Sequence, residues 1–145
     1  MSDPAAANRP DFDNLSVGDS IPQLVAAPID RDQLRRYAEA SGDHNPIHLN
    51  EAAARSVGLP GVISHGMLNM AVLGRLITNW VPQSQVRAYS TRFAALVLPG
   101  DVITCSGVIA ALEEADGEKR AKLDLVARNQ NGETVLKGQA EVALP

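Results

Sequence analysis

One segment constrains the fold more than any other: residues 65–80 carry apolar side chains around most of a helical circumference. Only Arg75, Thr78 and Asn79 form a polar stripe on it. A helix that is apolar on most sides must be covered by other structure. The segment is also too short and too often interrupted by polar residues to cross a membrane, which takes roughly 20 apolar residues. We therefore expect a buried helix at the centre of a domain.

The residues after this helix can supply its cover. Four runs with strand character follow, and turn dipeptides separate them at Pro99-Gly100, Asp116-Gly117 and Asn131-Gly132. The last two runs alternate apolar and polar side chains, which predicts one dry face and one wet face. Because the links are short, we expect an antiparallel meander. The sequence thus predicts an α+β domain in which a sheet packs against one buried helix.

Two shorter helices are expected before it. Asp30 stands at a helix N-cap position, and an amphipathic pattern runs from there to Gly42, which ends it. A second, weaker helix is expected to start at Asn50 and continue over Glu51 to Ser56, with Gly58 and Pro60 stopping it. The residues between these helices form a loop.

Composition narrows the class of protein. The 145 residues show no repeat, and we expect a flexible leader over residues 1–13 followed by a single domain over residues 14–145. With 17 acidic and 13 basic side chains the net charge is -4, and no basic cluster is interleaved with aromatics, so nucleic acid is not an expected partner. Cys105 is the only cysteine and no signal-peptide pattern is present, which favours a cytoplasmic location.

The loop between the two short helices concentrates chemically active groups. Residues 41–48 read SGDHNPIH and contain an acid, two imidazoles and an amide. Pro46 pushes Asn45 into an extended conformation, so Asp43 and His48 converge only if the loop curls back. The residues alone leave a second interpretation open, in which Asp43 or Asn45 closes an Asx turn and His48 is an exposed loop residue.

The same segment resembles the signature of a known family. Ser41 to His48 match SGDxNPxH of the hydratase 2 or MaoC-like dehydratase family, which includes (R)-specific enoyl-CoA hydratases. His65-Gly66-Met67 resembles the HGM that opens the family's central helix, and Phe93 and Pro99-Gly100-Asp101 resemble two later positions. The ordered motifs run over roughly residues 15–144. The chain departs from the family at Asn50, where an acidic residue is usual.

The resemblance implies a hot dog fold, in which an antiparallel sheet wraps a long central helix. It also implies a homodimer, or a heterodimer with a related hot dog subunit, and a trans-2-enoyl thioester of coenzyme A or acyl carrier protein as substrate. By the same match Asp43 and His48 are the catalytic residues that hold a water molecule. We expect His48 to act as the main base toward C3 while Asp43 positions the water and returns a proton to C2. The product would be a (3R)-3-hydroxyacyl thioester.

Gly66 is the candidate for the oxyanion hole. A helix N-terminus presents free N–H groups and favours an anion, and glycine allows the thioester to approach closely. The alternative is that Gly66 is a packing glycine. We expect neither a cofactor nor a metal, because no spacing matches a metal ligand set and His65 is explained as the residue that introduces the helix. The other signature residues are expected to support the loop: Ser41, Gly42, Asn45 and Pro46.

Three other functions are alternatives to the hydratase. One is a (3R)-hydroxyacyl-acyl-carrier-protein dehydratase of fatty-acid synthesis working as a heterodimer; the others are a hot dog thioesterase and a non-catalytic acyl-binding subunit. Several basic side chains could contact the phosphates of a carrier, although a solvated strand face explains them equally. They are Arg87, Arg92, Lys119, Arg120 and Lys122.

Overall fold

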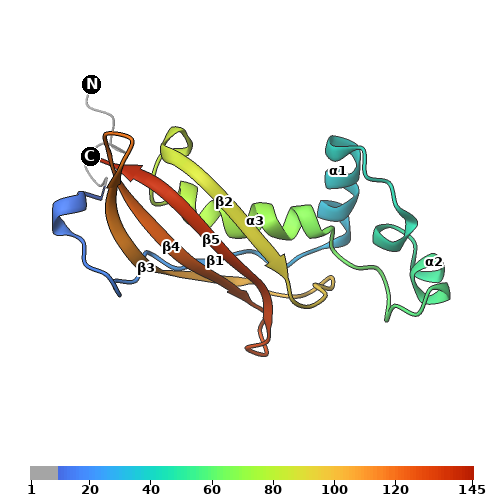
Figure 1. The fold of residues 1–145 in the computed structure, drawn as a ribbon. Coiled ribbons are helices and arrows are strands. Elements are labelled where there is room, and N and C mark those ends of the chain that lie inside the picture. Colours follow the sequence, from blue (N-terminus) through green and yellow to red (C-terminus); the bar gives the residue numbers. More distant parts are fainter. Residues whose placement is uncertain (1–9) are drawn as a thin grey trace, which may run out of the picture.

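An antiparallel sheet of five strands curls around one long helix in the computed structural model, which describes residues 10–145 (Figure 1). The helices are α1 (Arg31–Ser41), α2 (Glu51–Ser56) and α3 (Gly66–Thr78). The strands are β1 (Leu24–Val25), β2 (Val86–Phe93), β3 (Thr104–Ala115), β4 (Glu118–Arg128) and β5 (Thr134–Leu144). Short 3-10 turns lie at Phe12–Asn14, Pro46–His48 and Gln83–Gln85. None of the helices among residues 10–145 combines the length and the apolar character that a membrane crossing requires.

The core lies between α3 and the sheet. Leu73 and Leu76 of α3 are fully buried, and Leu123 and Leu136 from β4 and β5 pack into the same apolar cluster. The predicted buried helix is therefore confirmed. Its last turn ends at Thr78, and the chain turns there toward β2.

The strand order corrects the expected meander. The order across the sheet is β1-β3-β4-β5-β2, so β3, β4 and β5 form a meander but β2 does not pair with β3. Residues 94–103 instead cross over, and β2 pairs with β5. This crossover lets the sheet close over α3 from both sides. The two-residue strand β1 also pairs with β3, and its sequence gave no strand signal.

Local sequence signals are confirmed at the helix ends and at one hairpin. Asp30 Oδ1 accepts a hydrogen bond from the N–H of Gln33 at 2.7 Å, as an N-cap does. Asn50 caps α2 in the same way. Asp116 and Gly117 both have positive φ, 52° and 75°, which is typical of the tight turn that joins two twisted strands.

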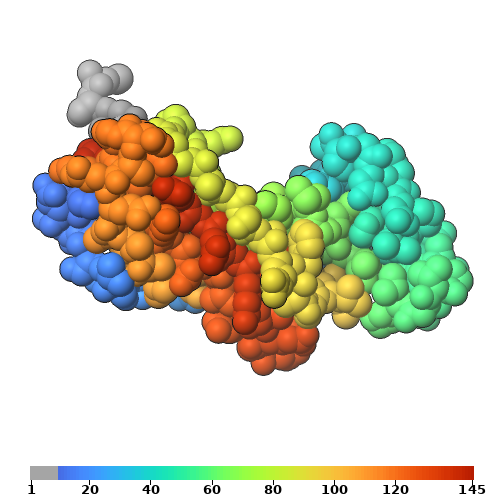
Figure 2. Space-filling view, viewed as in Figure 1, coloured from blue at the N-terminus to red at the C-terminus, as the bar shows by residue number. Residues whose placement is uncertain are grey.

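Residues 30–60 project beyond one end of the sheet, and the N-terminal end of α3 points toward them (Figures 1 and 2). The expected leader, residues 1–13, lies mostly outside the described residues. Within the described part, the N–H of Phe12 donates to the carbonyl of Pro145 at 3.3 Å, and Asp13 pairs with Lys119 at 3.4 Å.

The β3–β4 hairpin end of the sheet carries an ion-pair network that predicts a pH effect. Hydrogen bonds from Arg87 and Arg120 lower the pKa of Glu118 to about 2 from 4.5. Because the folded pKa is depressed, Glu118 stabilises the fold above pH 4.5 and this contribution is lost as the pH falls toward 2. We expect Glu118→Gln to lower the thermal midpoint at pH 7 and to match wild type near pH 2. A midpoint difference that is the same at both pH values would contradict this assignment.

Candidate active site

A chain of side-chain to backbone hydrogen bonds curls the loop after α1. Gly42 ends the helix with φ of 78°, a conformation that favours glycine. Ser41 Oγ then accepts from the N–H of Asp43, Asp43 Oδ1 from that of Asn45, and Asn45 Oδ1 from that of Ile47, each at 3.2 Å. These are three successive turns closed by short polar side chains. They fold the segment back on itself.

The curl brings Asp43 and His48 together. Asp43 Oδ2 lies 3.9 Å from His48 Nε2. This distance is too long for a direct hydrogen bond, but one water molecule can reach both atoms through bonds of about 2.8 Å. The carboxylate is half exposed, whereas the imidazole is buried. The pair is therefore open to a ligand from the Asp43 side.

The other ring nitrogen fixes the tautomer of His48. Its Nδ1 lies 2.7 Å from the carbonyl oxygen of Ile63. A carbonyl can only accept a hydrogen bond, so Nδ1 carries the proton and donates it. Nε2 then holds the lone pair and faces Asp43. His48 is thus oriented as a base toward the space beside the carboxylate.

The side chain of His65 contacts both Asp43 and His48. Its ring stacks on that of His48, with centroids 3.9 Å apart and an interplanar angle of 25°, and the ring of Tyr37 meets it edge-on. His65 Nε2 donates to the backbone carbonyl of Asp43 at 3.1 Å. Its Nδ1 is buried without a partner among the described residues. Burial lowers the pKa of His65, and the neighbouring His48 lowers it further, so the ring stays neutral near pH 7.

Asp43, His48 and His65 each place one potential ligand atom within 4.8 Å of the others. The lone pair of an imidazole nitrogen lies in the plane of its ring. Because the two rings are stacked, their lone pairs run side by side and do not converge on a point, as tetrahedral coordination requires. The absence of a metal remains a prediction, and this geometry supports it.

Gly66 begins α3 directly after His65. The first hydrogen bond of the helix runs from Asn69 N–H to the His65 carbonyl, and the His65 side chain caps no N–H group. The N–H groups of the first turn therefore lack partners within the helix. A Cβ atom at Gly66 would lie 3.3 Å from the Phe93 ring, so a side chain would be tight there. The contacts of His65 hold this helix end against the loop that carries Asp43 and His48.

The structure thus gathers the predicted residues Asp43 and His48, and it places Gly66 next to the residue that supports them. The expected loop-supporting residues are accounted for, because Ser41, Asn45 and Gly42 close the turns and Pro46 opens the 3-10 turn. His44, at the position that the signature leaves free, is exposed. Sequence reasoning missed the role of His65. Its signal was an imidazole directly before an apolar helix, where a side chain with a hydroxyl or carboxylate is the usual cap.

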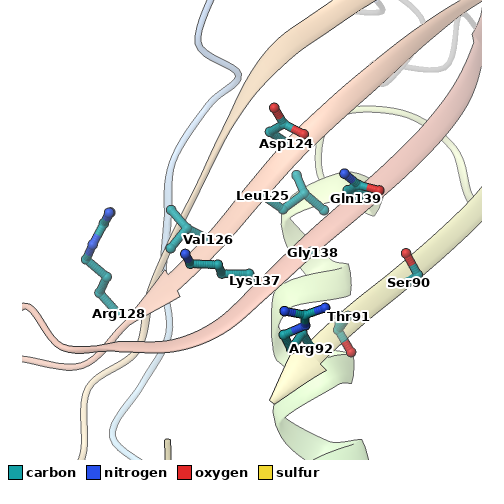
Figure 3. A pocket seen from close by; sticks show the side chains of 10 residues that line it. All are labelled: Ser90, Thr91, Arg92, Asp124, Leu125, Val126, Arg128, Lys137, Gly138 and Gln139. Carbon is teal, nitrogen blue, oxygen red and sulfur yellow. The ribbon is translucent and has the colours of Figure 1, made fainter. Parts of the chain in front are cut away.

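Two hollows in the surface bear on the site. One of about 490 Å³ reaches His48 from the side of α1, and it is also lined by Arg31, Asp32, Arg35, Leu49 and Val62. A second of about 530 Å³ lies on the outer face of the sheet, contains neither Asp43 nor His48, and is shown in Figure 3. The first hollow therefore reaches His48 of the candidate pair, and neither hollow is lined by Asp43 or Gly66.

A helix wrapped by an antiparallel sheet, with an acid and an oriented imidazole beside the helix N-terminus, defines a hot dog domain with a candidate acid–base site. Residues 12–130 match the family model described as MaoC like domain. The chain belongs to this family of hydratases and dehydratases.

Relatives and solved structures agree with this assignment. Fatty acid synthase subunit beta of Saccharomyces cerevisiae is 38% identical over 112 residues, which are 75% of this chain but 5% of that protein. The mitochondrial 3-hydroxyacyl-[acyl-carrier-protein] dehydratase of Arabidopsis thaliana is 30% identical over 132 residues, covering 90% of this chain and 78% of the relative. The (R)-hydratase from A. caviae involved in PHA biosynthesis superimposes with a TM-score of 0.79 at 28% identity, covering 91% of this chain and 98% of that one.

The support from His65 can be tested without removing the stack. We expect His65→Phe to keep a ring against His48 and to lose the hydrogen bond to the Asp43 carbonyl, which lowers kcat about tenfold. The thermal midpoint should change little, because the unpaired Nδ1 is removed as well. His44→Phe, at an exposed neighbouring position, is the matched control and should leave kcat unchanged. Equal rates in the two variants would mean that the Asp43 contact has no catalytic role.

Proposed function

We propose that this protein is a (3R)-specific hydratase that reversibly adds water to trans-2-enoyl-CoA and forms (3R)-3-hydroxyacyl-CoA, without a metal or redox cofactor. The observation that carries the proposal is the orientation of His48. Its Nδ1–H is held by the Ile63 carbonyl at 2.7 Å, so its Nε2 lone pair faces the Asp43 carboxylate. A water molecule between them has a base on one side and a second acceptor that fixes its orientation.

The chemistry follows from this arrangement. His48 Nε2 takes one proton from the water as the water oxygen bonds to C3 of the enoyl group. The electron pair of the double bond moves toward the thioester, and the enolate oxygen gains negative charge. A proton then passes from the Asp43–His48 pair to C2, so water is added overall and both residues return to their starting states. Because one pair serves both carbons, the addition is syn.

The enolate oxygen needs hydrogen-bond donors. We assign this role to the N–H of Gly66, since the first turn of α3 leaves such groups free and the helix dipole favours an anion. The absence of a side chain at Gly66 leaves room for the thioester.

We also propose a homodimer in the cytoplasm. Within residues 10–145, strand β2 pairs only with β5 and so presents an unpaired edge over residues 86–93. Such an edge is normally covered in a stable protein, and pairing with a second copy is one way to cover it. The single cysteine, which is buried, suits a reducing compartment.

The test is an assay of crotonyl-CoA and longer enoyl-CoAs, followed through the loss of enone absorbance, with chiral analysis of the product. The proposal predicts hydration to the 3R alcohol. Formation of the 3S product, or release of free thiol, would contradict it, and thiol release would favour a thioesterase.

One observation favours a second candidate function. The Arabidopsis relative, aligned over most of its length, is named as a dehydratase of acyl-carrier-protein substrates. This chain would then dehydrate (3R)-3-hydroxyacyl-acyl-carrier-protein, with the same two residues working in reverse. Comparing kcat/KM for one acyl group on coenzyme A and on acyl carrier protein separates the two candidates.

A further inference from the structure

The basic side chains of the sheet divide into two groups. Those near the β3–β4 hairpin all have carboxylate partners: Arg87 with Glu118, Arg120 with Asp116, Glu118 and Glu141, Lys122 with Glu113, and Lys119 with Asp13. At the other end of the sheet Arg92, Arg128 and Lys137 are exposed. Among residues 10–145 none of these three side chains forms an ion pair or donates a hydrogen bond. Of the earlier candidates for phosphate contacts, only Arg92 therefore remains free.

The three free cations lie together. Arg92 is directly opposite Lys137 in the β2–β5 ladder, and Lys137 is opposite Val126, two residues before Arg128 in β4. All three line the same hollow of about 530 Å³ (Figure 3). We call Arg92, Arg128 and Lys137 the basic triad. Like charges directly opposite each other destabilise a sheet, so the fold gains nothing from this arrangement.

The rest of the lining is mixed, with Leu125, Val126 and Gly138 beside four polar residues. Ser90, Thr91 and Gln139 offer hydroxyl and amide groups, and Asp124 is its one carboxylate. With three cations against one anion, the hollow is positive in a chain whose net charge is -4. Its volume lies within the range of sites that bind small molecules. An anion with several charges and at least one hydrogen-bond donor fits this set of groups.

The hollow is close enough to the catalytic end to serve the same substrate. Phe93, next to Arg92 in sequence, places its ring against Gly66. Arg92 and Phe93 are the last two residues of β2, so the start of α3 and the outer face that carries Arg92 lie on either side of this strand end, which pairing of the β2 edge with a second copy leaves open. Neighbouring strands are only about 4.8 Å apart. The pantetheine arm of a thioester is far longer than this width.

We infer that the basic triad binds the nucleotide end of coenzyme A, with the cations on its phosphates and Asp124 accepting from a ribose hydroxyl or the adenine amino group. This inference rests on the proposed function for its choice of ligand. A carrier protein presents phosphopantetheine through a single phosphodiester, which one cation satisfies. Three cations match the several phosphates of coenzyme A better.

The test measures binding, so it does not depend on turnover. Isothermal titration of the full-length protein with coenzyme A, and with pantetheine, which lacks every phosphate, should show phosphate-dependent affinity that falls with salt. Arg92→Gln with Lys137→Gln should weaken coenzyme A binding at least tenfold and leave pantetheine binding unchanged. The matched control is Lys122→Gln, a cation on the same sheet face that is already paired with Glu113. It should bind coenzyme A like wild type.

Equal affinity for coenzyme A in wild type and the double variant would overturn the inference. If that variant also turned over acyl-carrier-protein thioesters more slowly, the triad would be assigned to a phosphoprotein carrier instead. If the triad binds coenzyme A but the protein hydrates no enoyl-CoA, the inference stands and the proposed reaction fails. The thermal midpoint of the double variant should stay level or rise, because a like-charge contact is removed.

Discussion

Exchange of His48 for glutamine is expected to lower kcat by about 10²- to 10⁴-fold, and exchange of Asp43 for asparagine should have an effect of similar size. The reason is geometric: the water must meet a lone pair at His48 Nε2 and a carboxylate oxygen 3.9 Å away. Asparagine fills the same volume but carries no charge and cannot take up a proton. The measurement is kcat for the hydration of crotonyl-CoA at saturating substrate.

The double variant makes this prediction sharper. Residues that act as a unit are strongly non-additive, so His48→Gln with Asp43→Asn should be hardly slower than either single variant. His44→Gln is the control for the loop, because His44 is exposed beside the same residues. Multiplicative losses in the double variant would mean that the two groups act independently and do not share one water molecule.

The second large effect is expected at Gly66. Gly66→Ala should lower kcat about 10²-fold, as the loss of one oxyanion-hole donor does, because a methyl group there blocks the approach of the thioester to the helix N-terminus. The new Cβ would also lie 3.3 Å from the Phe93 ring. Phe93 is 55% exposed and can move, so we expect only a small loss of stability from this contact.

Two further variants distinguish a blocked approach of the substrate from simple crowding of neighbouring side chains. Gly74 lies in the same helix as Gly66, and Gly74→Ala places a Cβ 3.4 Å from the ring of Tyr89. This variant reproduces the crowding away from the site and should leave kcat unchanged. Phe93→Leu combined with Gly66→Ala relieves the crowding and should not restore the rate. Recovery of activity in that double variant would show that Gly66 is a packing glycine.

Much of the architecture could be predicted from the sequence, because its signals are local. The N-caps Asp30 and Asn50, the αL glycine at 42 and the Asp116-Gly117 turn depend on short-range backbone chemistry, and each lies where it was expected. The crossing of β2 to β5 was missed, because pairing between distant strands depends on how the whole sheet closes over α3. The two residues of β1 are too few to show a periodicity.

The candidate site also has one part that the sequence predicts and another that depends on long-range contacts. The curl of the loop follows from the spacing of short polar side chains, which offer turn-closing oxygens at Ser41, Asp43 and Asn45. Two contacts could be found only from the tertiary structure. They are the hydrogen bond to the Ile63 carbonyl, which sets the tautomer of His48, and the stacking of the His65 ring on the His48 ring. Both come from residues 15 or more positions further along the chain. No local pattern specifies such contacts.

The position of the loop outside the sheet also affects how the protein responds to stress. Asp43 and His48 sit on the projecting segment, whereas Gly66 belongs to a helix whose later turns are locked in the core. His65 contacts the loop through its stacking on His48 and its hydrogen bond to the Asp43 carbonyl. Segments with few buried contacts open with a smaller free energy than the core does. We therefore expect the loop to open while the sheet and α3 stay folded, so amide hydrogens of residues 41–50 should exchange with solvent well before those of β4 and β5. Such an opening would separate the proposed pair of Asp43 and His48 without unfolding the protein.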